Sequence, residues 1–151
     1  MSKINIIYST ISGNTELVIQ KVVELLPSNI ESAVIRVDTA TQTDTQNCDL
    51  IILACPTYGQ GSLEAQFPRF LKTIQGSIEG KKFAVIGLGD TRYYPEYLTE
   101  SGSILEDWVK SYKGELAIPS LRIGMPPLKF IDKLVPRWVT KLLESLESKK
   151  E

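Results

Sequence analysis

A polar segment near the start of the chain has the residue types of a phosphate site: Ser9, Thr10, Ile11, Ser12, Gly13, Asn14 and Thr15. It separates a short apolar run from an amphipathic helical pattern. Where a loop ends a buried strand and opens a helix, free backbone N–H groups converge on one point, and the helix dipole favours an anion there. Four hydroxyl side chains add hydrogen-bond donors, and Gly13 permits close approach of the backbone. The segment is therefore predicted to bind phosphate.

The donors of this segment are neutral, since no Lys or Arg lies between Tyr8 and Ile19. The triphosphate-binding P-loop would need a Lys before its Ser or Thr, and a dinucleotide site would need G-x-G-x-x-G; the segment has neither. A tightly held monophosphate fits these donors best. The alternative is a polar turn from strand to helix, with Ser12 or Asn14 as the helix N-cap.

Length and composition predict one domain, residues 1–151, because 151 residues with 42% hydrophobic content can bury a sizeable core. The chain has no histidine, which excludes His-dependent catalytic triads, and its two cysteines lack the spacing of a zinc site. Neither a signal peptide nor a membrane-spanning run is evident, so we expect a cytoplasmic protein. The net charge of −1 argues against nucleic-acid binding.

The elements that position the segment follow from hydrophobic patterning. Continuous apolar runs predict strands buried on both faces, near residues 4–8, 33–37, 50–55, 83–87 and 115–123. Apolar residues at helical spacing lie within residues 17–26, 67–74, 104–112 and 138–146. Residues 39–47 are expected to form a polar loop or weak helix, and Pro136 is expected in the first turn of the last helix. The alternation predicts an α/β fold: a three-layer, doubly wound, five-stranded parallel sheet of order 2-1-3-4-5. Ligands of such sheets bind beyond the carboxyl ends of the strands, among the loops after strands 1, 3 and 4.

The first of these loops matches in full the phosphate loop T-x-[ST]-G-x-T of flavodoxins, which the chain resembles. The resemblance implies flavin mononucleotide (FMN) as cofactor. The loop after the third run resembles the flavodoxin segment S-x-T-[WY]-G-x-G beside the isoalloxazine ring. Tyr58 would stack on the ring, and the Gly59-Gln60 peptide would turn its carbonyl toward flavin N5. The residues implied are Pro56, Thr57, Tyr58, Gly59, Gln60 and Gly61.

The loop after the fourth run resembles the flavodoxin pattern G-x-G-D-[ST]-x-Y, which carries the pyrimidine edge of the flavin. The residues implied are Leu88, Gly89, Asp90, Tyr93, Tyr94 and Tyr97. Two registers are open, in which either Tyr93 or Tyr94 covers the outer face of the ring, and Asp90 alternatively caps the next helix. Leu121-Arg122-Ile123-Gly124 resembles the end of the last strand in short-chain flavodoxins.

The function that this resemblance implies is electron transport rather than enzyme catalysis. A monomeric flavoprotein would cycle FMN between semiquinone and hydroquinone. It would take electrons from a flavodoxin/ferredoxin reductase-type donor and pass them to an iron–sulfur or metalloenzyme acceptor, without catalytic residues or a metal site. The alternatives are an FMN-dependent quinone or nitro reductase and a flavodoxin-like activator of a metal-radical enzyme. A phosphorylated receiver module would need an Asp where Cys55 ends the third run.

Overall fold

A parallel β-sheet forms the centre of the computed structural model, which describes residues 2–10, 13–58, 62–89, 100–124 and 131–147. Its strands run in the order β2-β1-β3-β5-β6, and β7 also pairs with β5. These strands are β1 (Ser2–Tyr8), β2 (Ile30–Arg36), β3 (Leu50–Tyr58), β5 (Lys82–Gly89), β6 (Glu115–Leu116) and β7 (Leu121–Gly124), and the short β4 (Ser62–Leu63) pairs antiparallel with β3. The predicted order 2-1-3-4-5 is confirmed.

The fifth position of the sheet is shared by β6 and β7, where the sequence pattern predicts one run. Phe83 of β5 pairs with Leu116 of β6, and Ile86 of β5 pairs with Leu121 of β7. Between these two pairs, the segment from β6 to β7 has more residues than the matching stretch of β5. The excess includes Pro119, which has no N–H to donate to a ladder. The strand is therefore interrupted there and resumes at β7.

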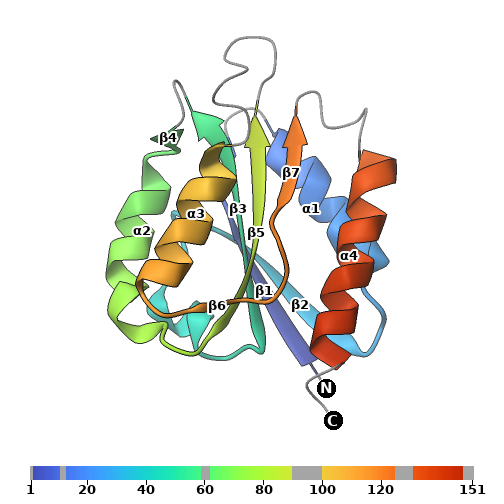
Figure 1. Ribbon diagram of the computed structural model, residues 1–151, viewed down its shortest axis with the longest axis horizontal. Coiled ribbons are helices and arrows are strands. Elements are labelled where there is room, and N and C mark those ends of the chain that lie inside the picture. The colour runs from blue at the N-terminus through green and yellow to red at the C-terminus, as the bar shows by residue number, and fades with distance from the viewer. Residues whose placement is uncertain (1, 11–12, 59–61, 90–99, 125–130, 148–151) are drawn as a thin grey trace.

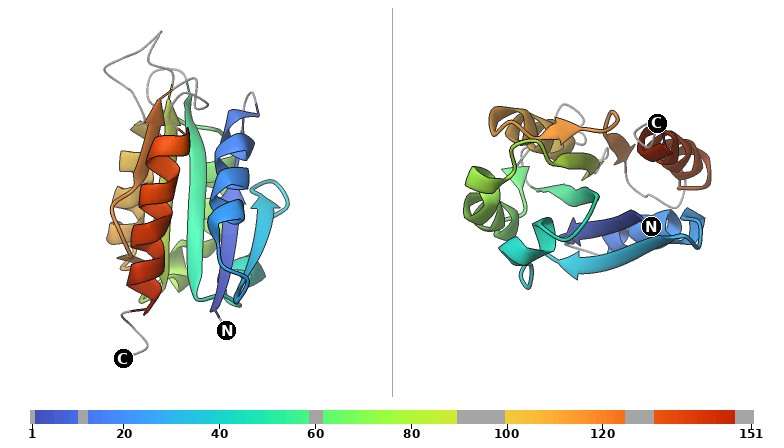
Figure 2. Two further views of the ribbon diagram at one scale, coloured as in Figure 1. Left: turned by 90° about the vertical axis from the view of Figure 1, so that its right-hand side faces the viewer. Right: turned by 90° about the horizontal axis from the view of Figure 1, so that it is seen from below.

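Helices cover both faces of the sheet (Figures 1 and 2). One face carries α1 (Asn14–Leu25) and α4 (Ile131–Glu147), and the other carries α2 (Gln66–Ile74) and α3 (Glu100–Ser111). The four predicted helical stripes correspond to these helices, and the polar stretch 39–47 contains a 3₁₀ turn, η1 (Gln42–Thr45). A second 3₁₀ turn, η2 (Gln75–Ser77), follows α2 directly. Over the described residues, no helix is long and apolar enough to cross a lipid bilayer.

Two apolar cores lie between the sheet and its helices because successive strand residues point to opposite faces. In β1, Ile4 and Ile6 pack toward α1 and α4, whereas Ile7 packs toward α2 and α3. All three side chains are fully buried. Burial on both faces explains why the strands appear in the sequence as continuous apolar runs.

The start of the last helix differs from the prediction. The helix α4 begins by Ile131, so Pro136 lies in its second turn, and the prediction of a first-turn position is wrong. Pro136 removes an N–H that would bond to the carbonyl of Asp132. Burial of Ile131 and Val135 against the core stabilises the helix upstream of the proline.

The first turn of α3 lies directly against β5. A Cβ atom added to Gly87 would lie 2.7 Å from the backbone nitrogen of Gly102, and one added to Gly102 would lie 2.7 Å from Nε of Arg122. Only glycine permits this approach of helix to strand. The guanidinium of Arg122 is held in turn by Glu106, at 2.9 Å, and its Nε donates to the hydroxyl of Ser120. Although burial alone would raise the pKa of Glu106, hydrogen bonds from Ser120 and Arg122 lower it below its usual value.

Replacing Gly87 with Ala tests this contact. Because the added methyl meets backbone atoms that cannot rotate away, we expect the free energy of unfolding of the apoprotein to fall by about 1–3 kcal/mol. The matched control is Gly76→Ala, where an added Cβ meets nothing within 4 Å; its effect should stay within about 0.5 kcal/mol. Urea denaturation followed by circular dichroism measures both. Equal effects of the two substitutions would contradict the close packing of α3 on β5.

Candidate functional site

The carboxyl ends of the central strands meet at one edge of the sheet, where the arrowheads of β3, β5 and β7 point the same way in Figure 1. Tyr8 pairs with Ala54, and Gly89 pairs with Gly124. The backbone N–H of Ser9 donates to the carbonyl of Ala54 at 3.1 Å, so the first loop leaves β1 beside β3. This alignment brings together the segments predicted to bind the ligand.

The first loop enters α1 through Gly13, which is the N-cap and has φ of +83°. Its backbone N–H donates to Oγ1 of Thr10 at 2.8 Å, and among the described residues no side chain caps the helix. Helix α1 begins at Asn14, so Asn14 is not its N-cap. Its first N–H groups point along the helix axis, where the dipole favours an anion. Ile11 and Ser12 lie outside the described residues.

Thr15 carries a buried hydroxyl at the start of α1. The residue is 1% exposed, and among the described residues its Oγ1 has no hydrogen-bond partner. Buried polar groups are rarely left unpaired, because each loses its hydrogen bonds to water. A ligand that accepts hydrogen bonds at the start of α1 would satisfy this hydroxyl. Ser9, which is also buried, donates its own hydroxyl to Sγ of Cys55 at 3.4 Å.

The second loop follows the end of β3, where Pro56 pairs with Leu88 of β5. The hydroxyl of Thr57 accepts a hydrogen bond from the backbone N–H of Ser101 and donates one to its Oγ, both at 3.1 Å. This hydroxyl therefore contacts α3. The backbone of Tyr58 ends β3, and Gly59, Gln60 and Gly61 lie outside the described residues.

The third loop starts where β5 ends. Leu88 is buried, and Gly89 is the last residue of the strand. Asp90, Tyr93, Tyr94 and Tyr97 lie outside the described residues, so the two registers for the outer tyrosine both stay open.

Ser101 and Cys55 are the residues at this edge that sequence reasoning did not select. Oγ of Ser101 donates to the carbonyl of Cys55 at 2.8 Å, and the Ser101 residue is fully buried. The two residues are 46 positions apart, so no local pattern connects them. The one indication in the sequence is the small pair Ser101-Gly102 in a helix that otherwise follows the usual apolar spacing.

The thiol of Cys55 is electrically neutral at physiological pH. Burial raises its pKa to about 11, and the hydrogen bond from Ser9 offsets part of that effect. A neutral, buried thiol is a poor nucleophile. Cys55 therefore acts at this edge as a small apolar side chain that also accepts a hydrogen bond.

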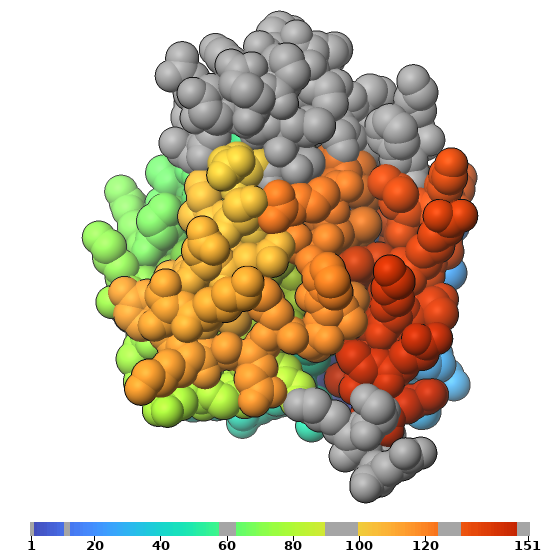
Figure 3. Space-filling model, in the orientation of Figure 1, coloured from blue at the N-terminus to red at the C-terminus, as the bar shows by residue number. Residues whose placement is uncertain are grey.

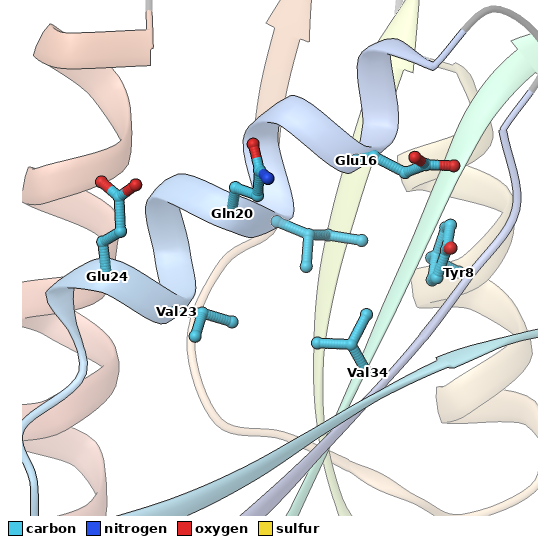
Figure 4. Close-up of a pocket in the computed structure, with 7 residues that line it drawn as sticks. Tyr8, Glu16, Gln20, Val23, Glu24 and Val34 are labelled. Atoms are coloured by element: carbon cyan, nitrogen blue, oxygen red, sulfur yellow. The ribbon is translucent and has the colours of Figure 1, made fainter.

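Two of the hollows between described residues lie on the side of the sheet that α1 and α4 cover. One, of about 390 Å³, lies between α1 and the edge strand β2, with Tyr8, Glu16 and Val34 around it (Figure 4). Burial raises the pKa of Tyr8, and the nearby Glu16 adds to the rise. The other, of about 350 Å³, lies between β7 and α4, which are side by side in Figure 3. Neither hollow is lined by the predicted phosphate-binding residues that the structure describes.

The raised pKa of Cys55 predicts a loss of stability in alkaline solution. Below pH about 9 the thiol is protonated in both the folded and the unfolded chain; between pH about 9 and 11 only the unfolded chain ionises. The stability advantage of the wild type over Cys55→Ala should therefore shrink across that range, by at most about 1.4 kcal/mol per pH unit. Urea denaturation of both apoproteins at pH 8, 9, 10 and 11 measures it. A difference that stays constant with pH would contradict the burial of the thiol.

Comparison with known proteins gives a consistent result. The sequence profile of the flavodoxin family matches residues 6–133. The chain is 30% identical to probable flavodoxin 2 of Bacillus subtilis (strain 168) over 134 residues, which are 84% of this chain and 85% of that protein. The structure of oxidised flavodoxin 2 from Bacillus cereus superimposes with a TM-score of 0.85 at 28% identity, over 95% of this chain and 99% of that one.

A flavodoxin from Fusobacterium nucleatum, solved with flavin mononucleotide bound, has the same fold, with a TM-score of 0.84 at 20% identity over 95% of this chain and 98% of that one. The profile match spans most of the chain, and it includes the first loop and the ends of β3 and β5. On this evidence the chain belongs to the flavodoxin family.

Proposed function

We propose that this protein is a cytoplasmic, monomeric carrier that binds FMN at the carboxyl edge of its sheet and transfers single electrons between redox proteins. The observation that carries the proposal is the hydroxyl of Thr15, which is buried at the start of α1 and has no hydrogen-bond partner among the described residues. Flavodoxins are electron carriers, and one relative in fold was solved with FMN. When bound, FMN supplies the redox chemistry, and the protein determines where the cofactor lies and how stable each of its charge states is.

The phosphate of FMN fits the first loop. The backbone N–H groups at the start of α1, together with the hydroxyl of Thr15, provide neutral donors, and the sequence has no Lys or Arg between Tyr8 and Ile19. We propose that Ser9, Thr10, Ile11, Ser12, Gly13, Asn14 and Thr15 surround this phosphate. Because Ser9 already donates to Cys55, its contribution would come from the backbone or from a rearranged hydroxyl.

The ring of FMN would lie between the second and third loops. We propose that Tyr58 stacks on one face and that Tyr93 or Tyr94 stacks on the other, with Pro56, the backbone of Thr57, Gly59, Gln60, Gly61, Leu88, Gly89, Asp90 and Tyr97 around the edges. An aromatic environment disfavours the anionic, fully reduced flavin. The two one-electron steps would therefore occur at separate potentials.

The proposed donor is a flavodoxin/ferredoxin reductase-type protein, and the proposed acceptor is an iron–sulfur protein or metalloenzyme. The rival function is that of an FMN-dependent quinone or nitro reductase, which needs a substrate pocket beside the flavin. Electron carriage is the better-supported function, because the chain belongs to the flavodoxin family, whose members are electron carriers.

The phosphate contact can be tested by replacing Thr15. Loss of one hydrogen bond to a charged group corresponds to about 1.5–3 kcal/mol, so Thr15→Val should weaken FMN binding roughly 10- to 100-fold. Thr15→Asp should weaken it further by charge repulsion. Riboflavin has the ring without the phosphate, so its affinity should be much lower than that of FMN and unchanged by Thr15→Val. Fluorescence quenching of each flavin by the apoprotein measures these affinities. Equal binding of FMN and riboflavin by the wild type would overturn the phosphate assignment.

Electron carriage itself can be tested on the FMN-loaded protein. Stepwise reduction with dithionite under anaerobic conditions should show two separate one-electron transitions in the visible spectrum. The same preparation should oxidise NADPH only slowly in the presence of a quinone, unless a flavodoxin reductase is added. A single two-electron transition with rapid, unassisted quinone reduction would favour the reductase function instead.

A further inference from the structure

A compact hydrogen-bond network joins the end of β3 to the start of α3. The backbone N–H of Ser101 donates to Oγ1 of Thr57, Oγ1 of Thr57 donates to Oγ of Ser101, and that Oγ donates to the carbonyl of Cys55. Ser101 is fully buried, and Cys55 is too. Every polar atom of the network therefore has its partner inside the protein rather than in water.

The hydroxyl of Thr57 caps a helix from another element of the structure. Ser101 is the second residue of α3, and its N–H is one of the donors that a helix cannot satisfy internally. The usual solution is a side chain just before the helix in sequence. Here the partner is 44 positions away, on β3, so the cap also fixes the position of α3 relative to the sheet.

The close packing described above limits movement of the same helix turn. Gly102 lies against Gly87 of β5 on one side and against the side chain of Arg122 on the other. The start of α3 is thus held against β3 by hydrogen bonds, against β5 by backbone contact, and beside β7 by Arg122.

We propose that Thr57 and Ser101 are a pair of positioning residues for the flavin, which hold the two ring-binding segments in register with each other. Thr57 immediately precedes Tyr58 and the Gly59–Gln60 peptide in sequence, and Ser101 follows the segment with Tyr93, Tyr94 and Tyr97. The pair fixes the distance between the chain that enters one segment and the chain that leaves the other. This inference rests on the FMN site proposed above.

The expected effect follows from the fraction of apoprotein that is ready to bind. With the hydrogen-bond network intact, nearly all of the apoprotein would be in the conformation that binds FMN. If loss of the network lowers that share to about a tenth, the apparent FMN affinity falls about tenfold. The same loss leaves the N–H of Ser101 buried and unpaired, so part of the energy goes into destabilising the fold. The two effects can be separated, because only the first requires FMN.

The experiment measures FMN affinity, by fluorescence quenching of the added cofactor, for Thr57→Val, Ser101→Ala, the double variant and Thr57→Ser. We expect Thr57→Val to bind FMN about tenfold more weakly, and Thr57→Ser, which keeps the hydroxyl, to bind within about twofold of the wild type. Because the two residues share a hydrogen bond, the loss in the double variant should be smaller than the product of the two single losses.

The matched control is Thr45→Val, the same substitution at a residue that is 1% exposed and that donates its hydroxyl to the carbonyl of Gln42 in η1. It should lower thermal stability without changing FMN affinity. Should Thr57→Val fail to fold, Ser101→Ala carries the comparison with Thr45→Val. Unchanged affinity in the network variants, or equal loss in Thr45→Val, overturns the positioning role. Failure of the wild type to bind FMN would instead overturn the proposed function.

Discussion

The pairing of β1, β3 and β5 as buried parallel strands is the interaction on which the rest of the molecule depends. Parallel pairing aligns the carboxyl ends of these strands, so three loops that are far apart in sequence open at one edge. Because helices cover both faces, most side chains in these strands are apolar, and the register is held by packing on two sides. Asn5, in the middle of β1, is a buried polar exception, and its amide donates to the carbonyl of Asp44.

Buried polar groups at this edge are of two kinds, and the difference separates binding from support. The hydroxyl of Thr15 has no protein partner among the described residues, whereas the hydroxyls of Thr57 and Ser101 are paired with each other and with the backbone. An unpaired group gains most when a ligand arrives, because its desolvation is already complete. A fully paired group gains nothing from a ligand and instead gives rigidity to its surroundings.

The sequence was sufficient to predict the sheet order, the helices and the place of the first loop, since these follow from apolar periodicity and from the residue types between Ser9 and Thr15. It was insufficient where one residue contradicts the local pattern. Pro136 suggested a helix start, but burial of Ile131 and Val135 extends α4 beyond it. The last predicted strand is divided into β6 and β7, and where each part pairs with β5 could not be predicted from the presence of Pro119 alone. The small pair Ser101-Gly102 indicates close packing, but the partner of Ser101 could not be predicted from it, because the contact with Thr57 depends on the tertiary packing of α3.

Packing of α3 connects the fold to the proposed cofactor site. The helix can approach β5 so closely only because Gly87 lacks a side chain, since a Cβ atom there would lie 2.7 Å from the backbone nitrogen of Gly102. At a larger separation, Oγ of Ser101 could not reach the carbonyl of Cys55, and its N–H could not reach Thr57. Gly87, which is not among the residues proposed to contact the cofactor, thus determines whether the hydrogen-bond network can form.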